Sequence, residues 1–329
     1  MSFKLLKRLC AFVPVVGALA TSTAYASDAA SYPQQPIKIV VPFSAGGAVD
    51  VLARLLGTSL TKTLGQPIIV ENRPGAGSNI GANYVAMAKP DGYTVLLATS
   101  AALAVNPSLY KNLAFDPKKD FKPVVLATTL PNLVVVNQKN SVATMQELTQ
   151  SLKKRGEAAF YASAGSGTPT HLGVELYKQE IGAKAVHVPY KGGAPALADL
   201  AAGRVDFMFA VAPEALPLIK AGEIKALAVT TKERIRSLPD LPTVAETGVP
   251  GFEMLTWYGA VVPAGTPDVI VDKLNAAFNV ALQDEHIASR LRDLGFEISG
   301  GSPKQLEDQM ASDADKWGTL IKKMNITLD

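Results

Sequence analysis

The chain has 329 residues, of which 48% are hydrophobic and 19% charged, a composition that predicts a globular protein and excludes a disordered one. Lys4, Lys7 and Arg8 account for the whole excess of 32 basic over 29 acidic residues, so the rest of the chain is close to neutral. Because no basic field remains, neither nucleic acid nor an anionic membrane is expected as a partner.

The first 26 residues predict a secretory signal peptide. Their basic residues precede an apolar run, residues 9–20, that is too short to cross a bilayer. Ala24, Tyr25 and Ala26 fit the small-x-small cleavage rule, so we expect the mature chain to begin at Ser27 and to be periplasmic. The only cysteine, Cys10, lies in this segment, which excludes disulfides and thiolate chemistry from the mature protein.

Strand, loop and helix alternate in the next hundred residues. A short β-branched run is followed by a turn and an amphipathic helix that ends at Gly65, and the pattern then returns. The sequence predicts strands at 37–41, 68–70 and 94–98 and helices at 49–64 and 78–87. Such alternation is typical of a parallel sheet covered by helices.

A second set of these units follows an apolar, extended segment, residues 124–137, which suits a chain that passes from one lobe to another. The proline-rich residues 237–250 suit the return. Between these two segments the pattern predicts helices at 144–154, 170–180 and 195–201 and strands at 159–162, 185–188, 206–209 and 226–229. After the return it predicts a strand at 254–262 and helices at 267–283, 286–294 and 303–324.

These elements predict a two-lobed α/β protein, since roughly 300 residues exceed what one hydrophobic core holds. We expect the first lobe to comprise residues 27–129 together with a return segment, 251–329, and the second lobe to comprise 130–250. Two connections between the lobes would permit hinge bending and prevent separation.

Two loops between a strand and a helix are the best candidates for a ligand site, because ligands of open α/β sheets bind beyond the carboxyl ends of the strands. Glycines let the backbone approach a ligand, and the following helix directs free N–H groups at an anion. A carboxylate can therefore lie between the loops, unless the glycines serve only the turns and Asp50 only caps a helix. The loops are Phe43, Ser44, Ala45, Gly46 and Gly47 with Asp50, and Ser163, Ala164, Gly165, Ser166, Gly167 and Thr168 with His171.

Other motifs point away from catalysis and cofactors. Residues 74–81 space their glycines as GxGxxxG, a weak match to a dinucleotide fingerprint, so we expect a helix-start loop at the edge of the cleft. His171, His187 and His286 lack metal-ligand spacing, and no metal is expected. Because Ser166 has no G-x-S-x-G elbow, hydrolysis is the weakest alternative, and His171 is expected to pack under its loop or to donate a hydrogen bond to it.

Two acidic residues have two possible roles, and an aromatic pair has an expected structural one. Asp199 and Asp206 are either ligand contacts, favouring an amine or hydroxyl on the ligand, or structural acids. Trp257 and Tyr258 are expected in core or hinge packing. Neither candidate loop contains Lys or Arg, and Arg54 lies a turn inside its helix, so recognition is expected to use N–H groups, hydroxyls and water.

Five segments resemble the extracytoplasmic solute receptors of tripartite tricarboxylate transporters, often called Bug receptors. They occur in order and cover nearly all of the mature chain. The segments are IVVPFSAGGAVDVLAR, ENRPGAGSNIGANYVAMAKPDGYTVL, YASAGSGTPTHL, VPYKGGAPALADLAAGRVDFMF and LPDLPTVAETG.

The resemblance implies a type II periplasmic binding fold without catalytic activity or cofactor, in which two strand-loop-helix pincers hold a di- or tricarboxylate, an acidic amino acid or an aromatic acid. The loaded receptor, expected to be a monomer, would dock on integral membrane transporter subunits. A sensor of the same fold that signals to a membrane-bound kinase is the alternative. The implied contacts are Phe43 to Gly47 with Asp50, Ser163 to Thr168 with His171, and Asp199, bordered by Ser78 and Ser100.

Overall fold

The computed structural model describes residues 31–235, 238–324 and 326–328. The chain separates into two units, residues 1–32 and residues 33–329, and every strand and helix below belongs to the second. The predicted signal peptide lies outside the described residues. In the described part of the chain, no helix is long and apolar enough to span a membrane.

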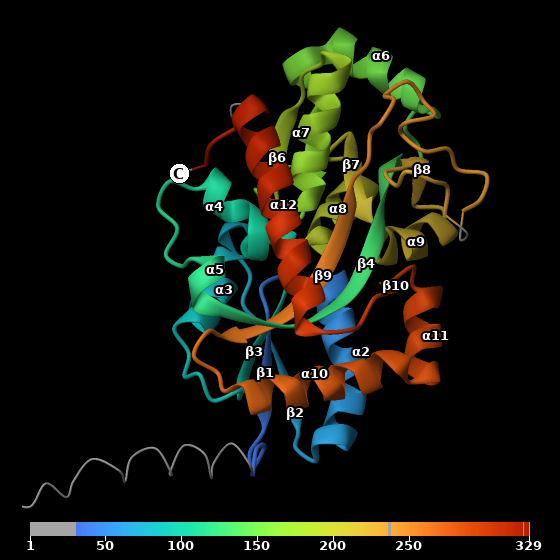
Figure 1. The fold of residues 1–329 in the computed structure, drawn as a ribbon. Helices are drawn as coiled ribbons and strands as arrows, with labels where there is room; N and C mark the ends of the chain where they lie inside the picture. Colours follow the sequence, from blue (N-terminus) through green and yellow to red (C-terminus); the bar gives the residue numbers. More distant parts are fainter. Residues whose placement is uncertain (1–30, 236–237, 325, 329) are drawn as a thin grey trace, which may run out of the picture. The chain divides into compact units, whose positions relative to one another are not determined.

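The predicted alternation of strands and helices is present through both halves of the second unit (Figure 1). The strands are β1 (Ile37–Val41), β2 (Ile68–Asn72), β3 (Thr94–Thr99), β4 (Phe121–Asn137), β5 (Phe160–Ser163), β6 (Val186–Pro189), β7 (Phe207–Val211), β8 (Ile224–Val229), β9 (Leu255–Pro263) and β10 (Glu297–Ile298). The α-helices are α2 (Ala48–Leu64), α3 (Asn79–Ala86), α4 (Asn106–Leu109), α5 (Pro117–Asp120), α6 (Met145–Arg155), α7 (Pro169–Ile181), α8 (Gly193–Ala201), α9 (Ala212–Lys220), α10 (Asp268–Gln283), α11 (Glu285–Asp293) and α12 (Pro303–Met324). Shorter turns of helix are η1 (Ala76–Ser78), η2 (Ala101–Val105) and η3 (Gly156–Ala158).

The strands pair in the order β2-β1-β3-β9-β4-β7-β5-β6, with β8 and β10 also paired to β4. The strand-loop-helix units pair in parallel, β1 with β2 and β3, and β5 with β6 and β7, as predicted. Every pairing of β4 and β9 is antiparallel, which the sequence pattern does not predict. The reason is that these two strands connect the sets of units and run back along them instead of continuing a crossover.

Strand β4 belongs to two groups of strands. Its residues up to Pro131 pair with β9, and the following residues, Asn132 to Asn137, pair with β7 and β8. We call the strands on either side of this change the first strand group (β1, β2, β3, β9, β10) and the second strand group (β5 to β8). Strands β4 and β9 run side by side where the two groups meet (Figure 1).

The second half of β4 and strand β7 are buried on both faces. Val134 and Phe209 lie in one hydrophobic core, and Leu133 and Met208 lie in another, because successive side chains of a strand point to opposite faces. Burial on both faces explains why the sequences of β4 and β7 are continuous apolar runs. The first strand group has its own core, which includes Val40, Leu96 and Trp257.

Helix α12 contacts two of these cores. Leu306 and Met310 pack in the core of the first strand group, whereas Trp317 and Ile321 pack in a core of the second. The last helix therefore lies along both groups of strands, as Figure 1 shows in red. The division into lobes at residues 129 and 250 remains a prediction.

Candidate functional site

Both candidate loops reach one small cavity between the strand groups, which we call the inner cavity. Phe43 and Gly47 line it from the loop before α2, and Ala164 and Thr168 line it from the loop before α7. Its volume is about 30 Å³, close to the share of a single water molecule in the liquid. This volume is too small for a di- or tricarboxylate.

A network around Asp50 stiffens the first loop. Asp50 is buried, and its carboxylate accepts hydrogen bonds from the Gly46 N–H at 3.0 Å, from Asn72 at 3.0 Å and from Arg54 at 3.0 Å. Burial acts to raise the pKa of Asp50, but these hydrogen bonds outweigh it and hold the pKa below its ordinary value. The Asp50 carboxylate thus supports the left-handed turn at Gly46, where φ is +82°, and it also pairs with Arg54.

Ser44 connects the first loop to the other strand group. Its N–H and its hydroxyl both donate to the carbonyl oxygen of Lys191, each at 2.9 Å. Lys191 lies between β6 and α8, so this contact joins the two groups. In this conformation the Ser44 donors are already used within the protein.

Side-chain hydroxyls at the second loop form hydrogen bonds with the backbone of the loop itself. The hydroxyl of Thr170 accepts from the Ala164 N–H at 3.0 Å, and the hydroxyl of Ser163 accepts from the Gly165 N–H at 3.1 Å. The Thr168 hydroxyl donates to the Gly165 carbonyl at 2.6 Å. The loop is consequently held in shape by the serine and threonine side chains that the sequence suggested as ligand donors.

Two histidines lie under the second loop. His171 accepts a hydrogen bond at Nδ1 from the Gly167 N–H at 3.1 Å, and His187 Nε2 lies 2.6 Å from Ser163 Oγ. Their rings stack with centroids 4.1 Å apart. Burial lowers the pKa of His171 to about 4, helped by Lys178, and burial with the neighbouring His171 lowers the pKa of His187 to about 3. Both rings are neutral at pH 7, and His171 packs under its loop as predicted.

Three of the remaining expected contacts lie away from the inner cavity. Ser78 is buried, and its hydroxyl donates to the Gly77 carbonyl. Ser100 is buried without a hydrogen-bond partner, and Asp199 accepts from Tyr190 at 2.7 Å and Arg204 at 2.6 Å. Their roles as ligand contacts stay predictions, as do those of Ala45, which is exposed, and of Gly46.

The other motifs have structural partners. A side chain on Gly77 would overlap the Ser166 carbonyl, so the glycine-rich residues 74–81 lie against the second loop. Asp206 forms a bidentate pair with Arg155 at 2.7 and 2.8 Å, a structural role. Trp257 donates to Asp313 in the core at 2.7 Å. Among the residues described, no group of three or more His, Cys, Asp and Glu could hold a metal ion.

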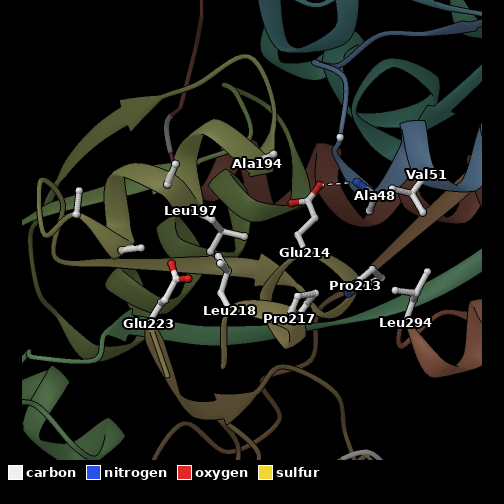
Figure 2. A pocket seen from close by; sticks show the side chains of 14 residues that line it. Ala48, Val51, Ala194, Leu197, Pro213, Glu214, Pro217, Leu218, Glu223 and Leu294 are labelled. Carbon is white, nitrogen blue, oxygen red and sulfur yellow. Dashed lines mark hydrogen bonds between the residues drawn. The ribbon is translucent and has the colours of Figure 1, made fainter. Parts of the chain in front are cut away.

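Sequence reasoning missed Glu214, which projects from the first turn of α9 into the inner cavity. Its Oε1 accepts a hydrogen bond from the Ala48 N–H at 2.7 Å, at the start of α2 (Figure 2). Burial raises the pKa of Glu214 to about 7, although the Ala48 hydrogen bond opposes this. The pattern did not predict α9, because Pro213 and Pro217 interrupt its helical periodicity.

Glu214 also lines a second, open space, which we call the apolar groove. This groove has a volume of about 670 Å³ and is bordered mainly by aliphatic side chains such as Leu197 and Leu218. Figure 2 shows Glu214 reaching toward Ala48 within the groove, with Glu223 at the opposite end from Val51. Thr99, Thr256 and Tyr258 add hydroxyl groups to the lining of the inner cavity.

Comparisons with known proteins agree on one family. The model of the tripartite tricarboxylate transporter family receptor, TctC, matches residues 52–326. A Pseudomonas protein from the tcbD-tcbE intergenic region is 39% identical over 305 residues, which are 92% of this chain and 90% of that protein.

Solved structures of periplasmic binding proteins share the fold. MatC from Rhodopseudomonas palustris with bound malate has a TM-score of 0.85 and 34% identity, covering 88% of this chain and 100% of that one. A second R. palustris protein, solved with adipate, has a TM-score of 0.87 and 38% identity, covering 90% and 99%. The α/β fold class expected from the sequence is therefore confirmed.

Proposed function

Since this chain belongs to the tripartite tricarboxylate transporter family of receptors, which bind solutes and are not enzymes, we propose that it captures a small carboxylate in the inner cavity and delivers it to membrane transporter subunits. The convergence of the two candidate loops on that cavity carries this proposal. Two strand-to-helix loops from different strand groups face each other there, in the position where an interlobe ligand would bind.

The first turn of α2 supplies the donors for an anion. Ala48 and Val49 line the inner cavity, and a helix leaves the N–H groups of its first turn without intrahelical partners. The Ala48 N–H donates to Glu214, so the other first-turn N–H groups are the donors left for a ligand. The positive end of the helix dipole lies at the same place. The structures solved with adipate and malate, which share this fold, support a carboxylate as the ligand.

Binding in this proposal is coupled to closure. The inner cavity is far smaller than a dicarboxylate, so the two strand groups open as lobes around β4 and β9, admit the acid and close on it. The lobe boundaries are those expected from the sequence, with residues 130–250 forming the second lobe. Receptors of this family are extracytoplasmic, and we propose that residues 1–26 are a cleaved signal peptide and that the mature receptor is a periplasmic monomer.

A thermal-shift screen tests this function. The chain without residues 1–26 is unfolded, freed of ligand, refolded and heated with adipate, malate, citrate, aspartate, glutamate or benzoate. A specific acid at one hundred times its Kd adds about 2.7 kcal/mol to the free energy of unfolding and raises the melting temperature. A folded protein whose melting temperature responds to none of these acids would contradict carboxylate capture.

A further inference from the structure

The Glu214 carboxylate occupies a position that the backbone leaves open for it. A side chain on Gly193 would overlap Oε2, and a Cβ on Gly47 would lie 3.0 Å from Oε1. Gly193 is the first residue of α8 and Gly47 precedes the first residue of α2, so the carboxylate lies against the N-termini of two helices. One of the donors expected for a ligand anion, the Ala48 N–H, is already bound to it.

No cation compensates this carboxylate within the described residues. Glu214 forms no ion pair there, and its only hydrogen bond is the one from the Ala48 N–H. The inner cavity has no Lys or Arg in its lining, and its other polar side chains are neutral hydroxyls. Glu214 is partly buried and also lines the apolar groove, and a carboxylate in such a place without a positive partner attracts a cationic group of the ligand.

We propose that Glu214 determines specificity by binding a cationic nitrogen of the ligand, so that the receptor selects carboxylates that also carry an ammonium group over plain dicarboxylates. This inference rests on the proposed function, because it concerns the same cavity. The ligand carboxylate binds the remaining first-turn N–H groups of α2 and the part of the inner cavity that Thr168 lines. The ammonium group of the same ligand lies against Glu214.

The ionisation of Glu214 agrees with this role. With its pKa raised to about 7, the group is close to half ionised at neutral pH and is readily shifted by what lies beside it. An ammonium group favours the ionised form, whereas a second carboxylate favours the protonated form. Of the other ionisable groups nearby, Tyr258 stays neutral because burial raises its pKa far above this range, Asp50 stays ionised beside Arg54, and Glu223 is exposed at the far end of the apolar groove.

Isothermal titration calorimetry with matched pairs of acids tests the proposal. The probes are succinate against aspartate and glutarate against glutamate, which differ only by the ammonium group. In the wild-type protein the amino acid of a pair binds at least tenfold more tightly than its diacid. Glu214→Gln keeps the shape of the side chain, loses most of this preference and binds the diacid as well as or better than the wild type does.

Glu223→Gln is the control, because it removes a carboxylate from the apolar groove outside the inner cavity and leaves both affinities unchanged. If Glu214→Gln fails to fold, the wild-type protein still gives a result: affinity for the amino acid rises between pH 6 and pH 8 while affinity for the diacid falls. A diacid that binds as tightly as its amino acid overturns the inference and leaves carboxylate capture standing. Failure of all four probes and of the wider acid panel overturns both.

Discussion

Gly47 and Gly193 leave the space that the Glu214 carboxylate occupies at the inner cavity. Gly47 was predictable as a site residue, because a Gly-Gly pair between a strand and a helix is visible in the sequence. Glu214 was not predictable, because its partner Ala48 is 166 residues away and no local pattern connects them. Asp50 supports the turn at Gly46 through oxygens that accept from its own loop and helix, and its role as a ligand contact stays a prediction.

Replacing Gly193 by alanine should displace the Glu214 carboxylate, because the new Cβ would overlap Oε2. Alanine is a good helix residue, so the protein should remain folded. We expect the affinity for the acid that binds most tightly to fall at least tenfold, or about 1.4 kcal/mol, measured by calorimetry. In a Glu214→Ala background the same change should have little further effect, and equal losses in both backgrounds would show that the two residues are not coupled.

The raised pKa of Glu214 also predicts how stability depends on pH. Because the unfolded chain ionises this group at a lower pH than the folded chain does, the free energy of unfolding falls as pH rises from about 4.5 through about 7. Glu214→Gln removes this dependence and should stabilise the protein at pH 8 by on the order of 2 kcal/mol relative to its effect at pH 4.5. Urea unfolding at the two pH values measures the difference, and an equal effect at both would count against an uncompensated carboxylate.

Elements with a strong period were predictable, and elements with interrupted or short patterns were not. Helix α2 begins and ends within one residue of its predicted bounds, since an amphipathic run ends at a glycine with left-handed φ. Helix α9 was missed because of its two prolines, and β10 has only two residues. The internal hydrogen bonding of the second loop could not be predicted, because it depends on how His187 of β6 lies beneath it.

The stacked histidines predict an acid-sensitive element. Both rings have lowered pKa values in the folded protein, so protons bind more readily to the unfolded chain as pH falls below about 6.5, and stability is lost toward pH 4. His187→Gln should make this loss shallower, even though it weakens the loop at pH 7. His286→Gln, at an exposed position, is the control. Identical pH slopes for the wild type and His187→Gln, from urea unfolding between pH 7 and pH 5, would contradict the buried neutral pair.

The sequence predicted two sets of strand-loop-helix units, one for each strand group. It did not predict how β4, β9 and α12 connect the two groups. Local periodicity indicates where strands and helices lie, and it carries no information on which distant strands pair. The antiparallel course of β4 and β9 and the course of α12 along both strand groups therefore came only from the structure. These shared elements hold the groups together, and the proposed opening of the lobes requires bending around β4 and β9.

A cysteine pair should lock the strand groups in the closed arrangement. A Cβ on Gly192 would lie 3.5 Å from the Cβ of Ser44, a separation that a disulfide can span, but φ at Gly192 is +153°, so a cysteine there costs backbone strain. Residues 27–329 contain no cysteine, so in this part of the chain the cysteines of Ser44→Cys and Gly192→Cys have only each other as intramolecular partners. When oxidised, the variant should bind and release its acid at least tenfold more slowly than when reduced, measured by stopped-flow fluorescence. Equal rates in both states would show that entry does not need the groups to open.

Native mass spectrometry of the receptor, purified without unfolding, tests carboxylate capture most directly. We expect the protein to carry one small acid per chain that is lost when the protein is denatured and is restored when the same acid is added after refolding. An acid that also bears an ammonium group would agree with the role of Glu214. A protein that carries no acid as purified, and that forms no complex with any acid of the panel, would contradict the account.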